Sequence, residues 1–598
     1  MKVAIPLPFG HKKNKFSLPH QMVTTSDFGK ICPICVTEMV PGDDFNVTSQ
    51  SFCRLAPMPV PTFADVTLET CAFYVPMRQL WYDGREFFAN QTYFSPNSKK
   101  IEPSAVPCAC NSMFAFMFTD GRYSMVTEEA THDFSMTVGS GTKYYKFTKN
   151  GRAIYDLLCS LGYQITFKWN DDTRMSLLPL LAFVHIVHEY YLPQIAYPDP
   201  NVQKILSLDS YYYTNCCTQW ESSAVGIRSL AASHAYNTIY TIINDLNFPL
   251  RSYLKNDYFT SAWKYPNGNP SNYSGTDSDA NLNVNVPNGP NSSQKVYSNL
   301  SAGTPPVLGD NNNALTNVGL NLLRAVTNYV TRNAVAGNKM VDRFFARFGI
   351  KLPDLTLQRP VYLGKSVQQI NISDVTATST VPSGSVLGDY AGKGTSYGNG
   401  KFSCSADEFG YFMIIQTIQP HTGIATGRKR HTVHLKYDEF YAPEFDCIGT
   451  QAIRKDEVFC RMFDEATANS LFEAGYAPNG VFGYCPRYSE YKFGAFTLSG
   501  DFVLGSRYDN MSSYHLFRDG FVGNPSIDRA FLSAGNTIYN EFNRIFNYTG
   551  NDYDHFFLVH QTNIIAYRNM HQVGDTLDLE DVHGNGRSVE VDYGGKHQ

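Results

Sequence analysis

The stretch DVTLETCAFYVPMRQLW, residues 65–81, decides the fold class. Its first half alternates between polar and apolar residues and its second half turns continuously apolar, which is typical of a buried strand. Upstream, KICPICVTEMVPGDD (residues 30–44) predicts a strand that ends at a Pro-Gly-Asp turn. Downstream, FGYFMIIQTI (residues 409–418) predicts another strand. These segments favour a mainly β protein.

Helical patterns are fewer, and long polar segments separate them. Apolar residues recur at helical spacing over residues 151–161, 177–191 and 314–348. Residues 267–313 consist mainly of Asn, Ser, Gly, Pro and Asp, so we expect a surface excursion without a core of its own. Residues 373–399, rich in Gly, Ser and Thr, predict a second loop, and the tail after residue 575 is expected to be polar and extended. Loops of this length are uncommon unless they are functional.

Composition points to interfaces more than to catalysis. Charged residues make up 17% of the 598 residues and aromatic residues 14%, whereas soluble domains average about 25% charged residues. Such a composition suits large, wet protein interfaces, and it also fits an ordinary aromatic-rich β-protein. The net charge of -5 predicts no global attraction of nucleic acid.

Compartment signals point to synthesis in a cytoplasm. No run of 18 apolar residues occurs, so no membrane-spanning helix is expected. The basic residues of the N-terminus follow its short apolar piece, the reverse of a signal peptide. The 13 cysteines are odd in number and scattered, which predicts free and mostly buried thiols.

Several short motifs resemble catalytic or metal-binding motifs, but the surrounding sequence lacks the residues or elements that such sites need. Gly394–Gly398 spells G-x-S-x-G, but its flanks supply neither the apolar strand nor the helix of a nucleophile elbow. Gly388–Lys393 falls one residue short of a phosphate-binding loop, and we interpret it as a flexible loop. His185 and His188 lie at i and i+3 with no third ligand nearby. Cys32-Pro-Ile-Cys35 has no second pair for zinc. We therefore predict a structural protein with no cofactor, no metal and no enzymatic activity.

Two basic clusters could neutralise phosphate groups, with solvated surface patches as the plain alternative. Their candidate DNA-contacting residues are Lys12, Lys13 and Lys15 in the first cluster, and Arg428, Lys429 and Arg430 in the second.

Several sequence blocks resemble, in order, the major capsid protein of the Microviridae, most closely its gokushovirus-like branch. The N-terminal blocks are FGKICPICVTEMVPGDDFNV (28–47) and SFCRLAPMPVPTFADVTLETCAFYVPMRQLW (51–81), with Leu178-Pro179 ahead of an aromatic helix. Later blocks are DYFTSA (257–262), LQRP (357–360), EFGY (408–411), KYDEFY (436–441) and FGYCPRY (482–488). They cover most of residues 16–520, while residues 192–250 and the tail after about residue 530 have no clear counterpart.

The resemblance implies a single eight-stranded antiparallel jelly roll with long inter-strand insertions and a few helices. Residues 1–598 would form one capsid domain, 267–313 a protrusion at the three-fold axis, and 530–598 a C-terminal extension of uncertain placement. Sixty copies would close a T=1 shell through five-, three- and two-fold contacts around circular single-stranded DNA.

The implied partners are further copies of the chain, the packaged DNA, a small basic DNA-binding phage peptide, a pilot protein and a host surface receptor. An acidic subunit facing DNA also requires such a basic partner on charge grounds. Asn267, Tyr273, Asn285 and Tyr297 are the candidate host contacts. The location would be the virion, and the bacterial host cytoplasm during assembly.

The alternative is a phage or bacterial surface adhesin, or another carbohydrate-binding β-protein. Hydrolysis of a sugar would need paired carboxylates. Asp438 and Glu439 are adjacent, so in a strand they would face opposite sides. The repeats and heptads expected of an adhesin stalk are missing from the sequence.

Overall fold

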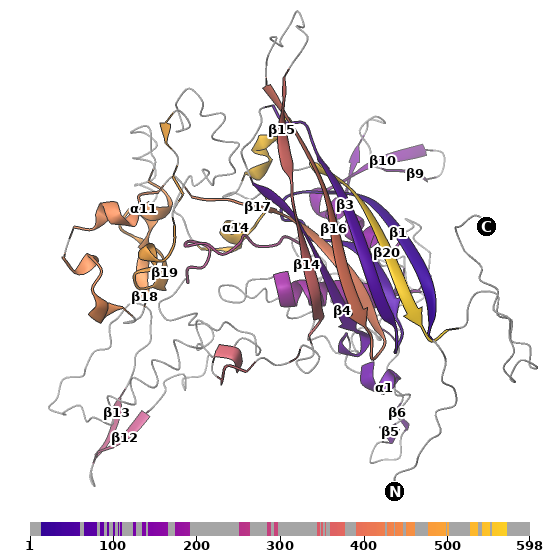
Figure 1. Ribbon diagram of the computed structural model, residues 1–598, viewed down its shortest axis with the longest axis horizontal. Coiled ribbons are helices and arrows are strands. Elements are labelled where there is room, and N and C mark those ends of the chain that lie inside the picture. The colour runs from indigo at the N-terminus through magenta and orange to yellow at the C-terminus, as the bar shows by residue number, and fades with distance from the viewer. Residues whose placement is uncertain are drawn as a thin grey trace, which may run out of the picture.

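The computed structural model contains two large antiparallel sheets and several smaller units (Figure 1). It describes residues 13–59, 65–80, 141–164, 174–191, 250–263, 359–376, 390–424, 427–435, 437–446, 450–460, 476–494, 496–497, 499–500, 527–535, 541–550 and 553–570, with short pieces at 84–88, 93–94, 100–101, 106, 108–110, 123–126, 134–138, 284–288, 292–296, 344–346, 348–350 and 353.

The five-stranded sheet has the order β1-β20-β3-β16-β15, and the four-stranded sheet has the order β14-β4-β17-β2. The strands of the first are β1 (Asn14–Ser26), β20 (Phe556–Arg568), β3 (Asp44–Leu55), β16 (Tyr390–Ser405) and β15 (Asn371–Thr376). Those of the second are β14 (Val361–Gln369), β4 (Val66–Pro76), β17 (Gly410–Pro420) and β2 (Cys32–Met39). The first four strands of the chain, β1 to β4, therefore alternate between the two sheets.

The inner faces of the two sheets pack on each other and form the core. Phe45 of β3 and Phe412 of β17 meet edge to face with ring centroids 6.1 Å apart. Val47, Ala72 and Ile564 belong to the same buried cluster. Sheet-on-sheet packing of this kind uses the inward-facing half of each strand.

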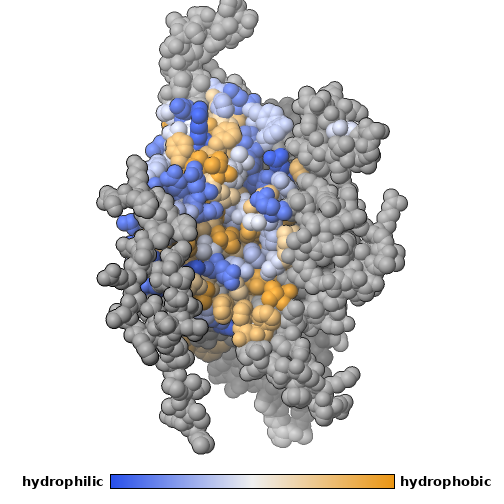
Figure 2. Space-filling view, turned by 90° about the vertical axis from the view of Figure 1, so that its right-hand side faces the viewer, coloured by the Kyte–Doolittle hydropathy of each residue, from blue (hydrophilic) through white to orange (hydrophobic). Residues whose placement is uncertain are grey.

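The outer faces of the two sheets differ. Every residue of β4 and β17 is buried, because the helices α3 (Lys149–Ser160) and α4 (Leu178–Ile186) pack on the outer side of the four-stranded sheet, where Phe73 and Met413 join one cluster with Leu158 and Phe183. In the five-stranded sheet, β3 and β20 alternate between buried and accessible residues. Its outer side is therefore a surface in this subunit (Figure 2).

The chain passes from one large sheet to the other between the consecutive strands β14 and β15. β14 pairs with β4, and after Ile370 the chain continues as β15, which pairs with β16 in the other sheet. Ile370 is buried at the crossing and belongs to the core shared by both sheets. This crossing joins the two sheets along one edge.

The described residues also contain shorter strands and helical turns outside the two large sheets. The minor strands are β5 (Tyr93–Phe94), β6 (Lys100–Ile101), β7 (Cys108–Cys110), β8 (Tyr123–Val126), β9 (Phe134–Val138), β10 (Gly141–Phe147), β11 (Arg174–Ser176), β12 (Val284–Asn288), β13 (Ser292–Val296), β18 (Thr450–Arg454) and β19 (Val481–Pro486). The short helical turns are η1 (Met77–Gln79), α1 (Gly84–Phe88), η3 (Val187–Tyr191), η5 (Arg430–Val433), η6 (Tyr437–Glu439), η7 (Pro443–Phe445), α11 (Lys455–Val458), η8 (Ser489–Tyr491), α14 (Arg529–Leu532) and η10 (Phe542–Ile545). Among the described helices, none combines the length and apolar character that a bilayer crossing requires.

Most of the strands and helices that the strong sequence patterns predict are confirmed. The strands predicted within residues 30–44, 65–81 and 409–418 are β2, β4 and β17, and the helix predicted at residues 151–161 is α3. The pattern at residues 177–191 forms α4 and the π-helical turn η3. Most of the helix predicted at residues 314–348, and the tail after residue 575, lie outside the described residues.

The prediction of a loop over residues 373–399 is wrong at both ends, because β15 reaches Thr376 and β16 begins at Tyr390. The glycines that suggested a loop face inward and allow close packing. A Cβ on Gly398 would lie 2.4 Å from Gln368 Oε1, and one on Gly394 would lie 2.9 Å from a methyl carbon of Leu55. Glycine inside a strand often marks such a close approach.

Residues that had suggested catalysis or metal binding lie in ordinary structural positions. Ser396, the centre of the G-x-S-x-G match, is buried within β16, where its Oγ donates to Gln369 O at 2.6 Å. Cys32 and Cys35 are buried free thiols of β2, and burial raises the pKa of each to about 11. His188 Nδ1 lies 3.0 Å from Glu189 Oε1.

Candidate functional site

Three of the sequence blocks come together beside β18 and β19, away from the two large sheets (Figure 1). Trp263 and Tyr484 exchange backbone hydrogen bonds of 2.7 Å in both directions, which joins the 257–263 segment to β19. Phe259 and Phe482 belong to one buried cluster with Phe531. Tyr488, which follows β19, contacts the third block, at residues 437–441, through its hydrogen bond to Phe440 O.

Tyr488 anchors that third block from an unusual backbone conformation. Its φ of 61° lies in the left-handed region, and it is the one non-glycine residue with positive φ in the described part of the chain. Its backbone N–H donates to Gln451 Oε1 at 3.0 Å. Its hydroxyl accepts from Ala442 N at 3.2 Å and donates to Phe440 O at 3.3 Å. Backbone strain of this type persists only where surrounding contacts determine it.

A cavity of about 340 Å³ lies next to the first of these blocks, between residues 257–259, 424–434, Glu457 and residues 490–496. Its lining combines cationic and imidazole side chains, carboxylates and aromatic rings. The lining residues with these groups are Arg428, Lys429, Arg430, His431, His434, Asp257, Glu457, Glu490, Tyr258, Phe259, Tyr491, Phe493 and Phe496. The second basic cluster predicted from the sequence therefore forms part of a cavity wall.

A buried carboxylate organises the cavity floor. Glu457, 4% exposed, accepts from Arg430 Nη1 at 2.6 Å and from Tyr258 Oη at 3.1 Å. Arg430 Nη1 also donates to Ala452 O at 2.9 Å. Burial, reinforced by the Glu457 carboxylate, raises the pKa of Tyr258 well above its ordinary value. The phenol therefore stays protonated and acts as a hydrogen-bond donor.

The neighbouring acid, Asp456, is held in the same way. Arg454 donates to both of its carboxylate oxygens, at 2.9 and 2.7 Å, and Arg428 Nη1 lies 3.7 Å from Oδ2. Arg428 itself keeps 54% of its side chain exposed. Lys429 contacts Thr497 Oγ1. Two cations, Arg428 and Lys429, thus remain accessible at this cavity, while Arg430 supports its floor.

Beside the cavity mouth lies a set of exposed apolar and aromatic side chains, which we call the aromatic patch. Its members are Leu435, Tyr437, Phe440, Tyr441, Phe445, Tyr491, Phe493 and Phe496. Tyr437 is 95% exposed and Leu435 88%.

The lining of this cavity is suited to binding a ligand. Each buried carboxylate at the floor is held by an arginine, and the described residues contain no group of three His, Cys, Asp or Glu side chains able to hold a metal. Cations beside aromatic walls suit a phosphate, a stacked ring or the side chains of another protein.

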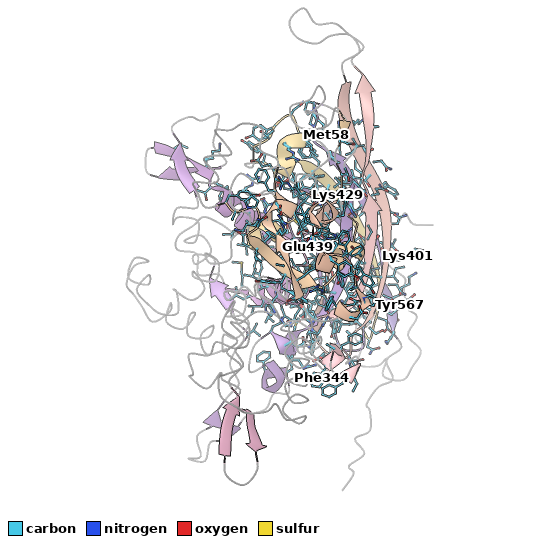
Figure 3. The ribbon with its side chains drawn as sticks, turned by 90° about the vertical axis from the view of Figure 1, so that its left-hand side faces the viewer. Met58, Phe344, Lys401, Lys429, Glu439 and Tyr567 are labelled. Atoms are coloured by element: carbon cyan, nitrogen blue, oxygen red, sulfur yellow. The ribbon has the colours of Figure 1, made fainter. Side chains whose placement is uncertain are left out.

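The predicted DNA contacts do not come together. Lys15 is exposed on β1, opposite Tyr567 of β20; Figure 3 shows Tyr567 well away from Lys429. Lys13 contacts Asp44, and Lys12 lies outside the described residues.

Of the predicted host contacts, Asn285 lies in β12 opposite Lys295 of β13. The other three, Asn267, Tyr273 and Tyr297, lie outside the described residues.

Sequence reasoning missed the buried acids and the aromatic patch. The signals were present: Asp456 and Glu457 are adjacent acids, and residues 435–445 are rich in Tyr and Phe. Nothing in the spacing, however, indicates that Glu457 pairs with Arg430, 27 residues earlier.

Comparisons with known proteins give a consistent result. The model of the family described as "Capsid protein (F protein)" matches residues 9–113 and 185–577, so β20 falls inside the matched region. The chain is 24% identical to Capsid protein VP1 of Chlamydia phage 1 over 590 residues, 88% of this chain and 90% of the relative. It is 22% identical to Capsid protein VP1 of Bdellovibrio phage phiMH2K over 542 residues, 88% of this chain and 89% of the relative. Capsid protein VP1 of Spiroplasma virus 4 is 31% identical over 80 residues, 13% of this chain and 14% of the relative.

Proposed function

Because this chain belongs to the phage capsid F protein family and is a structural capsid subunit, we propose that 60 copies of it close a T=1 icosahedral shell around a circular single-stranded DNA genome. Copies would meet at five-, three- and two-fold axes, where closed symmetry multiplies modest contacts. The subunit would be made and assembled in the cytoplasm of a bacterial host before it becomes part of the virion.

We propose that the two large sheets are a viral jelly roll. Eight strands support this: β1, β20, β3 and β16 are neighbours in one sheet, and β14, β4, β17 and β2 are neighbours in the other. β15 extends the first sheet beyond these eight. The jelly roll is a double-sheet architecture of eight antiparallel strands. In this proposal residues 1–598 are one capsid domain, and residues 530–598 contribute β20, an inner strand of the five-stranded sheet, to its core.

The exposure of the aromatic patch is the main observation that supports self-assembly of the chain. Monomeric soluble proteins rarely expose contiguous apolar patches without a binding role, and aromatic residues are enriched where protein surfaces meet. Tyr437 and Leu435 are nearly fully exposed, and Tyr488 holds the adjacent 440–442 segment through hydrogen bonds to Phe440 O and Ala442 N. We propose that a neighbouring copy of the chain covers the aromatic patch in the shell.

Further partners follow from charge and from the predicted protrusion. A subunit with net charge -5 neutralises little of a packaged genome, which supports a small basic DNA-binding phage peptide as a partner, alongside a pilot protein. Arg428 and Lys429 remain accessible for auxiliary phosphate contacts. Residues 267–313 would project at the three-fold axis toward a host receptor; the β12–β13 hairpin, drawn apart from both large sheets in Figure 1, lies within that segment.

Assembly of the purified full-length chain tests this function. Negative-stain microscopy and sedimentation should show closed shells or pentamers, and Leu435→Ser with Tyr437→Ser should reduce shell yield at least tenfold. Val367→Ser is the matched control, because Val367 is 55% exposed on β14 outside the aromatic patch. Wild-type protein that stays monomeric under all assembly conditions, or forms fibres as an adhesin would, contradicts the proposal.

A further inference from the structure

The outer side of the five-stranded sheet carries a second surface that the assembly argument leaves unused. We infer that the outward-facing residues of β1, β20, β3 and β16, which we call the open face, bind single-stranded DNA inside the shell. This inference rests on the proposed function, because it assigns the packaged genome to one particular surface of the subunit.

The strand registers align the open face into rows that cross four strands. One row consists of Val23, Val559, Phe52 and Tyr397, because Val23 pairs with Val559, Val559 with Phe52, and Phe52 with Tyr397. Two residues along each strand, the next row consists of Gln21, Gln561, Gln50 and Asn399. A regular apolar row thus lies beside a row of carboxamides.

The apolar row is accessible although it lies in the middle of a sheet. Val23 is 73% exposed, Tyr397 63% and Phe52 43%. Directly opposed side chains on one face of an antiparallel sheet lie about 5 Å apart, so the Phe52 and Tyr397 rings form a platform on neighbouring strands. Exposed aromatic rings on a sheet are the usual stacking surface for unpaired bases.

The charge of the open face is opposite to that of the whole chain. It carries four cations, Lys15, Arg54, Lys393 and Lys401, and one carboxylate, Asp44. Lys13 already contacts Asp44, whereas the four cations form no ion pair with any described residue. The chain as a whole has 54 acidic and 49 basic residues, so this cationic excess is local and complements a phosphate backbone.

The rest of the subunit leaves this surface accessible. The helices α3 and α4 pack on the four-stranded sheet, while the open face presents hydrophilic and hydrophobic side chains next to each other (Figure 2). Figure 3 shows Lys401 at the margin of the molecule, away from Lys429. We assign this accessible, cationic face to the inside of the shell, while the aromatic patch contacts neighbouring subunits.

Single strands fit this surface better than duplexes. Rings stack on bases only where the bases are unpaired, and carboxamides such as Gln50 and Asn399 can donate to and accept from base edges of any sequence. Cations on both sides of the apolar row would follow the backbone. The arrangement predicts binding with little sequence preference and a steep dependence on salt.

Fluorescence anisotropy of the full-length subunit with a labelled oligothymidine strand tests the inference. Lys15→Gln, Arg54→Gln and Lys401→Gln together should lower the slope of log Kd against log salt by about 2, since each lost phosphate contact removes about 0.7. Phe52→Ser with Tyr397→Ser should raise Kd about tenfold or more without changing the slope. Wild-type protein should bind the single strand more tightly than a duplex of equal length.

Matched control variants distinguish DNA binding by the open face from DNA binding by cations elsewhere on the subunit. Arg152→Gln with Lys492→Gln removes two exposed cations elsewhere and should leave the slope unchanged. If the loss of binding is confined to Arg428→Gln with Lys429→Gln, the cavity is the DNA site and the inference is overturned. Thermal unfolding of each variant shows whether it is folded.

Ultraviolet cross-linking of wild-type protein to the oligonucleotide is a second readout that needs no substitution. Cross-linked peptides should include residues 44–55 or 390–405, and cross-links found only elsewhere would overturn the inference. Shell formation is scored separately by microscopy. Normal shells with unaltered DNA binding in both open-face variants defeat this inference alone, whereas a wild-type chain that never assembles defeats the proposed function.

Discussion

Lys30 Nζ lies 2.7 Å from Asp554 Oδ2, so an ion pair between a buried ammonium and a partly buried carboxylate joins the segment before β2 to the segment before β20, 524 residues later. Thr25 Oγ1 donates to the same carboxylate oxygen at 2.8 Å, and Asp156 of α3 lies 3.6 Å from the ammonium. The Lys30 ammonium and the Asp554 carboxylate thus link β1 and the start of β20, two neighbouring strands of the five-stranded sheet, to the helix α3 that covers the other sheet.

Removing one partner of this pair should destabilise the fold. Asp554→Asn leaves the Lys30 ammonium buried with only the more distant Asp156, and we expect the free energy of unfolding to fall by about 3 kcal/mol. Urea unfolding measures the loss. The control is Asp446→Asn, which breaks an ion pair with the half-exposed Lys492 and should cost less than about 1 kcal/mol. Equal losses for the two variants would contradict this account.

The sequence predicts β4 and β17 well, because burial on both faces produces long apolar runs that no loop would carry. It fails for β16, whose outward residues apart from Tyr397 are polar and whose inward glycines leave room for Leu55 and Gln368. The sequence also does not predict where β20 lies. Its position between β1 and β3 depends on pairings between residues that are more than 500 positions apart in the chain. Such long-range pairing has no local signal.

For the candidate site, the run Arg428-Lys429-Arg430 revealed the cations but not their roles. Arg430 supports the floor through Glu457, and Arg428 is the accessible guanidinium. A run of like charges in a sequence does not show which members meet carboxylates after folding. The rows of the open face likewise depend on strand register, which the sequence alone does not supply.

The Arg430–Glu457 pair should behave as a unit. Arg430→Gln leaves the Glu457 carboxylate almost fully buried without its guanidinium, and we expect a loss of about 3 kcal/mol in the free energy of unfolding. Glu457→Gln in the same chain removes the buried charge and should restore part of that stability. A double-mutant cycle by urea unfolding measures the coupling. Strictly additive losses would show that the two side chains do not interact.

His560 should contribute to acid sensitivity. It lies buried in β20 with Nδ1 2.8 Å from Ser51 Oγ, and burial lowers its pKa from 6.5 to about 4. The unfolded chain therefore binds a proton between pH 6.5 and 4 that the folded chain does not. Stability from the neutral imidazole is complete above pH 6.5 and is lost as the pH falls toward 4, by about 3 kcal/mol.

Comparing His560→Gln with wild type isolates this contribution from that of the carboxylates. The variant should lose less stability than wild type between pH 7 and pH 4.5, as measured by urea unfolding at both values. His20→Gln, an exposed change on β1, should keep the wild-type difference. An unchanged pH dependence in His560→Gln would show that His560 does not titrate in this range.

Tyr488 offers a way to perturb the aromatic patch without altering its exposed surface. Tyr488→Phe removes the hydroxyl that contacts Ala442 N and Phe440 O, at a cost of about 1 kcal/mol in stability. The 440–442 segment should then sample more conformations, so that a neighbouring copy must order it on binding. We expect shell assembly, followed by light scattering, to slow several-fold while the sheets stay intact by circular dichroism. Tyr553→Phe removes a hydroxyl from a ring that is 61% exposed outside the aromatic patch, and this variant should assemble at the wild-type rate. If both variants assemble normally, the position of the 440–442 segment does not limit contact between subunits.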